Sequence, residues 1–136
     1  MVRRVLIADD NPEMRKLICR VFEPERIFEL CAEAVNGADA IAQARIWRPD
    51  LIILDLSMPV MNGIEAARAI HREMPRVPII LYTLYVQAIP ESEAAAHGIK
   101  RVVAKNDIGN LLSHANEMFR THEPTPNKSS RGNPGV

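Results

Sequence analysis

The chain has 136 residues, and its 17 basic and 17 acidic side chains give a formal net charge of zero. This length suits a single domain with one buried core, and the charge balance lacks the basic excess typical of nucleic-acid-binding domains. The longest uncharged stretch, Val77–Pro90, has 14 residues, whereas a membrane-spanning helix needs about 20 apolar residues, so we expect no membrane contact and no direct nucleic-acid binding.

The N-terminus and the cysteines indicate a cytoplasmic protein. The first apolar run, Val5–Ala8, is too short for the core of a signal peptide. Cys19 and Cys31 lack the spacing of a disulfide framework or a metal site. Each cysteine lies in an apolar pattern, so both are expected to be buried free thiols.

Short apolar runs, typical of strands, alternate with segments of helical period. The runs are Arg4–Ala8, Phe28–Ala34, Leu51–Leu54, Pro78–Tyr82 and Val102–Ala104. Apolar residues recur three and four positions apart between Met14 and Val21, and again between Ile108 and Phe119. This alternation predicts a parallel sheet with helices on both faces.

Polar residues mark where helices begin. Asn11 followed by Pro12 is typical of a helix N-cap and first turn, and Asn62 with Glu65 three residues later matches a capping box. These signals predict that two helices begin just after the first and third strands.

The chain becomes less regular toward its C-terminus. Pro90 delays the fourth helix, and Glu93–Ala96 offers little bulk for packing, so this helix is expected to be short and mobile. Residues 121–136 carry one apolar side chain, at the last position, and cannot compensate the entropy lost on ordering. We therefore predict a domain over residues 1–120 and a flexible polar tail over residues 121–136.

Polar side chains follow four of the five predicted strands. They are Asp9 and Asp10 after the first strand, Asp55 after the third, Thr83 after the fourth and Lys105 after the fifth. Each has a structural explanation when taken singly, such as helix capping or a surface charge. Together they meet at the carboxyl edge of a parallel sheet, where ligands bind in open α/β folds. This coincidence predicts a functional site.

The residue types narrow the chemistry of that site. Two like charges 4 Å apart repel by about 4 kcal/mol at an effective dielectric constant of 20. One lysine cannot offset the repulsion among three carboxylates, so we expect a bound divalent cation. Oxygen-only ligands favour Mg²⁺. A carboxylate beside Mg²⁺, a hydroxyl and an ammonium group is also a suitable nucleophile for phosphoryl transfer.

Five segments carry a resemblance to a known family. They are Val5–Asn11, Leu54–Pro59, Met61–Gly63, Ile80–Thr83 and Val103–Lys105. In their order, spacing and residue types the chain resembles the receiver domain of two-component response regulators, from residue 3 to about residue 120. The resemblance implies a flavodoxin-like, doubly wound parallel sheet of five strands in the order 2-1-3-4-5, with five helices.

The same resemblance implies roles for the polar residues. Asp55 would accept a phosphoryl group from a sensor histidine kinase or a histidine phosphotransfer protein. The Mg²⁺ ligands would be Asp9, Asp10, Asp55 and the backbone carbonyl of Ser57. Thr83 would be the switch hydroxyl, and Lys105 would bind a phosphoryl oxygen.

Three positions depart from the family pattern. Val102 stands where receivers usually carry an aromatic residue. In the family that residue turns inward when the switch threonine is drawn to the phosphoryl group. We therefore expect phosphorylation chemistry without this threonine–aromatic switch. Leu84, followed by Tyr85, replaces a small residue and is expected to crowd the mouth of the site and slow loss of the phosphoryl group. Asn106 replaces a proline that is often preceded by a cis peptide, so we expect a trans bond there.

The sequence favours a stand-alone receiver that signals to a downstream protein partner by contact. It would catalyse only its own phosphorylation and dephosphorylation. The alternative is a receiver-like binding module that acts without phosphorylation. A flavodoxin-like cofactor protein is disfavoured because the acidic segment Asp9–Glu13 would repel a nucleotide phosphate. A phosphatase with an aspartyl nucleophile is disfavoured because Ser57 stands where its second acid would be.

Overall fold

A computed structural model of the protein describes residues 1–120, and the predicted tail lies outside the described residues. The elements in chain order are β1 (Arg3–Ala8), α1 (Pro12–Phe22), β2 (Phe28–Ala34), α2 (Gly37–Trp47), β3 (Leu51–Asp55), α3 (Gly63–Glu73), β4 (Ile79–Thr83), the short 3-10 helix η1 (Val86–Ala88), α4 (Glu91–Ala96), β5 (Ile99–Ala104) and α5 (Ile108–Arg120). All five predicted strands are present.

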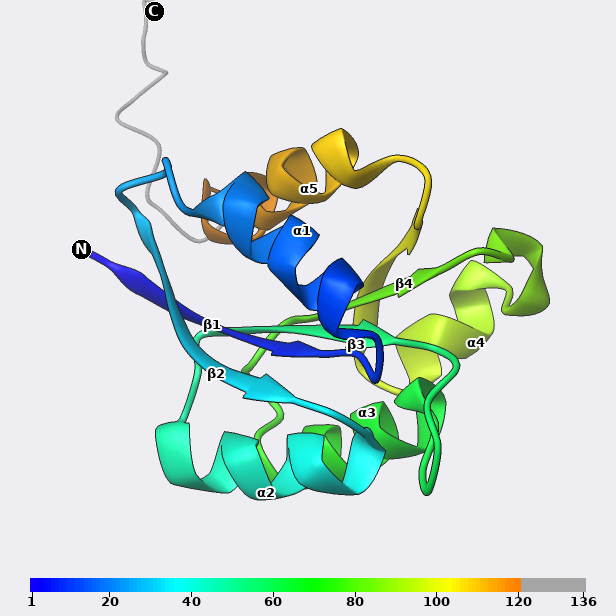
Figure 1. Ribbon diagram of the computed structural model, residues 1–136. Helices are drawn as coiled ribbons and strands as arrows, with labels where there is room; N and C mark the ends of the chain where they lie inside the picture. The colour runs from blue at the N-terminus through cyan, green and yellow to red at the C-terminus, as the bar shows by residue number, and fades with distance from the viewer. Residues whose placement is uncertain (121–136) are drawn as a thin grey trace, which may run out of the picture.

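The five strands form one parallel sheet in the order β2-β1-β3-β4-β5, which confirms the predicted topology. Helices α1 and α5 lie on one face of the sheet, and α2 and α3 lie on the other (Figure 1). The winding direction reverses between β1 and β3. The carboxyl ends of these two neighbouring strands therefore define the crevice in which doubly wound folds bind ligands.

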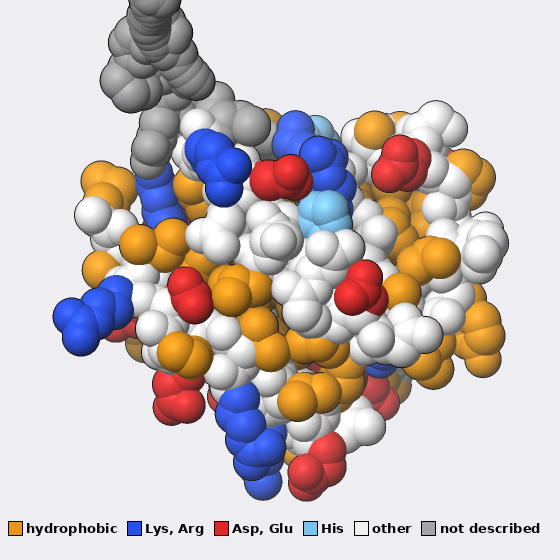
Figure 2. All heavy atoms as spheres, turned by 90° about the horizontal axis from the view of Figure 1, so that it is seen from above, with side chains coloured by type: hydrophobic (Ala, Val, Ile, Leu, Met, Phe, Trp, Pro, Cys, Tyr) orange, Lys and Arg blue, Asp and Glu red, His pale blue; other side chains and the backbone are white. Residues whose placement is uncertain are grey.

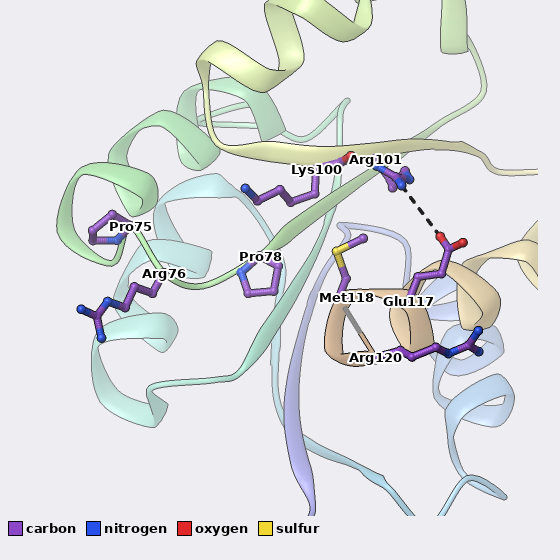
Figure 3. A pocket seen from close by; sticks show the side chains of 8 residues that line it. All are labelled: Pro75, Arg76, Pro78, Lys100, Arg101, Glu117, Met118 and Arg120. Carbon is purple, nitrogen blue, oxygen red and sulfur yellow. Dashed lines mark hydrogen bonds and ion pairs between the residues drawn. The ribbon is translucent and has the colours of Figure 1, made fainter. Parts of the chain in front are cut away.

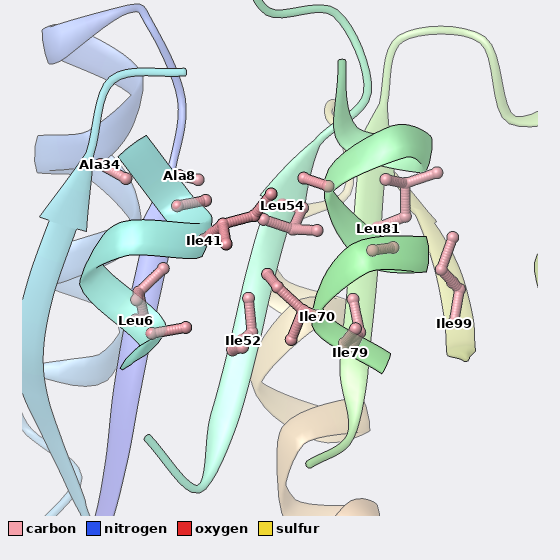
Figure 4. Packing of buried hydrophobic residues seen from close by; sticks show 14 of the residues in the cluster. Leu6, Ala8, Ala34, Ile41, Ile52, Leu54, Ile70, Ile79, Leu81 and Ile99 are labelled. Atoms are coloured by element: carbon pink, nitrogen blue, oxygen red, sulfur yellow. The ribbon is translucent and has the colours of Figure 1, made fainter. Parts of the chain in front are cut away.

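Strand alternation divides the core into two apolar clusters. In β3, Leu51 and Ile53 pack on the side of α1 and α5. Ile52 and Leu54 pack on the side of α2 and α3 (Figure 4). All four side chains are fully buried. A strand that is covered on both faces has apolar residues at successive positions, and the sequence of β3 has this pattern.

Caps fix the turns that lead from the strands into α1 and α3. The Asn11 side chain accepts hydrogen bonds from the N–H groups of Glu13 and Met14, at 2.9 Å and 3.4 Å. Asn62 and Glu65 form the predicted capping box, with reciprocal bonds of 2.9 Å and 3.1 Å. Each cap contributes about 1 kcal/mol of helix stability and orients the loop beside a strand end.

Two expectations need correction. Cys19 and Cys31 are free but only partly buried, because both lie near the β2 edge of the sheet. Desolvation raises the pKa of both thiols. Strand β5 begins at Ile99, three residues earlier than predicted, because the exposed Lys100 and Arg101 of this edge strand interrupt its apolar pattern.

Among residues 1–120, no helix has the length and apolar character needed to cross a membrane. On the face seen from the side of α1 and α5, acidic and basic side chains are interspersed and neither sign forms a large patch among the described residues (Figure 2). Helix α4 has six residues and follows η1, which agrees with the expectation of a short helix.

Candidate functional site

Three carboxylates meet at the carboxyl edge of the sheet. Asp9 and Asp10 follow β1, and Asp55 ends β3. One carboxylate oxygen from each residue lies within 4.8 Å of the other two. Asp9 and Asp55 are buried, whereas Asp10 is exposed. An open cluster of oxygen donors fits a hard divalent cation such as Mg²⁺, which keeps several of its waters.

Lys105 lies against the two buried carboxylates. Its Nζ atom is 3.1 Å from Asp55 Oδ1 and 3.5 Å from Asp9 Oδ2. One ammonium group therefore faces three carboxylates, and the cluster keeps an excess of negative charge. The structure thus brings together the lysine and the aspartates that the strand ends predicted.

The environment of Asp55 makes its carboxyl group a weaker acid than a free aspartate side chain. Burial, reinforced by the nearby charge of Asp9, raises the pKa of Asp55 to about 6. The Lys105 ammonium and the N–H of Ser57, which donates to Asp55 Oδ1 at 3.3 Å, act in the opposite direction. Any added cation at this cluster would favour the ionised, nucleophilic carboxylate.

Thr83 ends β4 with its side chain buried. Its hydroxyl oxygen accepts a hydrogen bond from the Tyr85 N–H at 3.1 Å, so the hydroxyl proton is left to donate to another group. The Thr83 carbonyl accepts the Lys105 N–H at 2.8 Å, which ties the end of β4 to the lysine.

The positions that depart from the family pattern are all placed. Leu84 and Tyr85 are exposed, and their effect on loss of the phosphoryl group stays a prediction. Val102 is partly buried and packs against the cluster on the α2 and α3 side. The bond before Asn106 is trans, as expected, since residues 1–120 contain no cis peptide.

Gly63 lets the loop after β3 fold back onto the site. Its N–H donates to the Leu56 carbonyl at 2.9 Å. A β-carbon at Gly63 would lie 2.2 Å from the carbonyl oxygen of Asp55 and 2.9 Å from Leu81 Cδ1. Only glycine fits there, and the close approach fixes the backbone that carries Asp55.

Tyr82 is a site residue that our sequence reasoning missed. Its side chain is fully buried, and its hydroxyl donates to Asp9 Oδ2 at 2.5 Å. Burial and the acceptor Asp9 raise the pKa of Tyr82 well above its ordinary value, so the phenol acts as a hydrogen-bond donor. The sequence offered one signal, because Tyr82 lies in a continuous apolar strand and a buried tyrosine needs an acceptor for its hydroxyl, but it did not identify that acceptor.

A separate hollow of about 610 Å³ lies at the opposite edge of the sheet. It is lined by Pro75, Arg76, Pro78, Lys100, Arg101, Glu117, Met118 and Arg120 (Figure 3). Arg101 Nη2 lies 3.9 Å from Glu117 Oε1. These residues come from the amino ends of β4 and β5 and from the end of α5, so the hollow is distinct from the carboxylate cluster.

Comparison with known proteins defines the family. Residues 5–116 match the response regulator receiver domain family. The protein therefore belongs to the receiver domains of two-component response regulators.

Individual relatives agree with this assignment. The chain is 36% identical over 122 residues to the protein-glutamate methylesterase/protein-glutamine glutaminase of Nocardioides sp., covering 85% of this chain and 33% of that protein. The chain spans between 23% and 33% of the length of six such methylesterases, the one from Nocardioides sp. among them.

Solved structures give the same fold. A LuxR-family two-component response regulator from Aurantimonas sp. superposes with a TM-score of 0.82 at 26% identity, covering 89% of this chain and 87% of that one. The response regulator domain of Thermotoga maritima CheB superposes with a TM-score of 0.79 at 23% identity, covering 91% of this chain and 100% of that one.

Proposed function

We propose that this receiver accepts a phosphoryl group on Asp55 from a sensor histidine kinase or a histidine phosphotransfer protein, in a Mg²⁺-dependent reaction in the cytoplasm. It then signals to a downstream protein by contact. The observation that carries the proposal is the position of Asp55, buried beside Asp9 and 3.1 Å from the Lys105 ammonium. Family membership over residues 5–116 supports it.

The proposed step is an in-line displacement at phosphorus. A carboxylate oxygen of Asp55 forms the new P–O bond while the P–N bond of the phosphohistidine breaks, and its electron pair leaves with the imidazole. Lys105 already contacts Asp55 and is placed to meet the negative charge of a phosphoryl oxygen. The free proton of the Thr83 hydroxyl supplies a second donor.

The donor set fits Mg²⁺, and its ligands would be the carboxylates of Asp9, Asp10 and Asp55 with the backbone carbonyl of Ser57. When bound, Mg²⁺ supplies positive charge that offsets the carboxylates and the phosphoryl oxygens. The side chains carry out the remaining roles. Asp55 attacks the phosphorus atom, and Lys105 and Thr83 bind oxygen atoms of the transferred phosphoryl group.

The decisive experiment is intact-mass measurement after incubation with Mg²⁺ and acetyl phosphate. We expect an adduct of one phosphoryl group, with acetate as the leaving group. The adduct should be absent from Asp55→Asn and present in Asp107→Asn, a matched change at an exposed aspartate near the site. A folded wild type that binds Mg²⁺ but gains no mass from small donors or from a panel of kinases would contradict the proposal.

Val102 favours a second candidate function, a receiver-shaped module that binds its partner without phosphorylation. A valine cannot swing inward as an aromatic side chain does, since branching at its β-carbon restricts its rotamers. The two functions differ in one measurement. Partner binding that is equally tight for wild type, phosphorylated protein and Asp55→Asn would favour the second.

A further inference from the structure

We propose that Tyr82 is a positioning residue of the carboxylate site. Its hydroxyl holds Asp9 in place and takes up part of that residue's charge, which leaves the Lys105 ammonium to Asp55. The inference deepens the proposed function and rests on it for the roles of Asp9 and Asp55. Neither the family match nor the sequence motifs assign a role to this tyrosine.

The sheet register places Tyr82 beside the site. Tyr82 pairs with Asp55 across the β3–β4 ladder, and with Ile80 it packs on the α1 and α5 side. Its side chain passes from β4 toward the end of β1 and reaches Asp9. Because Tyr82 and Asp9 are both fully buried, bulk water is not available to replace the hydroxyl as a donor.

The bonds around Asp9 show what the hydroxyl does. Asp9 Oδ1 accepts the Asn11 N–H at 2.8 Å, and Oδ2 accepts the Tyr82 hydroxyl at 2.5 Å. Short O–H···O⁻ bonds are roughly twice as strong as neutral ones. Both oxygens of Asp9 therefore have a close donor before Lys105 is considered, and the carboxylate is fixed in orientation.

The Lys105 ammonium lies closer to Asp55 than to Asp9. Its Nζ atom lies 3.5 Å from Asp9 Oδ2 but 3.1 Å from Asp55 Oδ1. It also lies 5.1 Å from the centre of the Tyr82 ring, within cation–π range. The hydroxyl satisfies Asp9 while the ring guides the ammonium, so the lysine is directed toward the proposed phosphoryl acceptor.

The substitution Tyr82→Phe tests the hydroxyl alone, because the ring and its contact with Lys105 remain. Partners that hydrogen-bond to metal ligands are typically worth 10–100-fold in affinity. We expect Tyr82→Phe to raise the Mg²⁺ dissociation constant, measured by calorimetry, about tenfold. At saturating Mg²⁺ it should still slow phosphorylation by acetyl phosphate, because Lys105 is then drawn toward Asp9.

The chain offers a matched control. It has two tyrosines, and the second, Tyr85, is 68% exposed. The variant Tyr85→Phe removes the same atom and keeps the ring, and because Tyr85 offers no ligand atom to the carboxylate cluster it should keep the Mg²⁺ affinity of the wild type. It also leaves Tyr82 as the sole tyrosine beside the single tryptophan, Trp47. The tyrosine bands of its near-ultraviolet difference spectrum on adding Mg²⁺, separated by wavelength from those of tryptophan, therefore report on Tyr82 and do not require Tyr82→Phe to fold.

The outcomes separate this inference from the proposed function. A Mg²⁺-induced tyrosine signal in Tyr85→Phe, absent from Tyr82→Phe, together with weaker Mg²⁺ binding in Tyr82→Phe, would support the positioning role. Equal Mg²⁺ affinity and equal phosphorylation rate in wild type and Tyr82→Phe would overturn it. If the wild type binds Mg²⁺ but gains no phosphoryl group, the proposed function fails, while the spectrum and the Mg²⁺ titration still decide the role of Tyr82.

Discussion

The carbonyl oxygen of Asp55 lies 2.2 Å from the position that a β-carbon on Gly63 would occupy. This approach joins the end of β3 to the first residue of α3. We expect Gly63→Ala to lower the free energy of unfolding by about 2–3 kcal/mol, because the new methyl group must displace backbone or Leu81. It should also slow phosphorylation by shifting Asp55.

Gly109→Ala is the matched control for that variant. Gly109 lies in α5, and nothing approaches its β-carbon position within 4 Å. Alanine favours a helix over glycine by about 0.8–1.0 kcal/mol, so this variant should be slightly more stable than wild type. Urea unfolding of both variants checks the pair. Equal effects of the two substitutions would refute the steric argument.

The pH dependence of stability should reveal the buried Asp55. Its pKa is about 6 in the folded protein, raised from 3.8 by burial and by Asp9, so the folded state binds this proton more tightly than the unfolded state does. The resulting stability is present below about pH 4 and is lost as the pH rises through about 6. The shift corresponds to roughly 3 kcal/mol at most.

Urea unfolding of wild type and Asp55→Asn, without Mg²⁺, measures this contribution. We expect Asp55→Asn to be more stable than wild type above about pH 7 and to lose that advantage as the pH falls toward about 4. Titrating groups outside this site contribute equally to both proteins and cancel in the difference. A constant difference across this range would mean that Asp55 ionises as freely in the folded protein as in the unfolded chain.

The strand ends were predictable from sequence because their signals are local. Asp9, Asp55 and Lys105 each follow a buried apolar run, and a parallel sheet brings such ends to one edge. Tyr82 was not predicted as a site residue because tyrosine is common in strands, and its position within β4 gave no further indication of a role. Its role depends on Asp9, a residue 73 positions away, and only the sheet register brings the two together.

The difference between the expected and the observed burial of Cys19 has a physical cause. Cys19 was expected to be buried, but its Sγ atom lies 3.9 Å from the exposed Glu33 carboxylate of β2. That strand is at the edge of the sheet and is only partly covered by α1. An apolar pattern on a helix indicates which face turns inward, but the depth of burial depends on what the neighbouring strand presents.

Val60 should be a site of stored backbone strain. It has a φ angle of 70° and is 82% exposed. A β-branched residue is unfavourable in the left-handed region, whereas asparagine tolerates it. We expect Val60→Asn to raise the free energy of unfolding by about 1 kcal/mol. Val35→Asn, at an exposed valine without positive φ, should bring no such gain, and thermal unfolding of both variants tests the difference.

Lys105→Met should show how strongly the two buried carboxylates depend on one ammonium group. Removing one partner of a buried ion pair typically costs 3–5 kcal/mol, but Asp55 can limit the cost by taking up a proton. Loss of Lys105, which lowers the pKa of Asp55, would raise that pKa further. The destabilisation should therefore be large near about pH 8 and smaller near about pH 5.

Two comparisons make this prediction specific. Lys100→Met removes the same charge from an exposed position of β5 and should change stability by less than about 0.5 kcal/mol at either pH. The double variant Lys105→Met, Asp55→Asn should recover much of the stability lost near about pH 8, because only Asp9 is then left without the ammonium and it keeps the Tyr82 hydroxyl as a donor. A cost for Lys105→Met that is independent of pH would show that Asp55 does not bind the compensating proton.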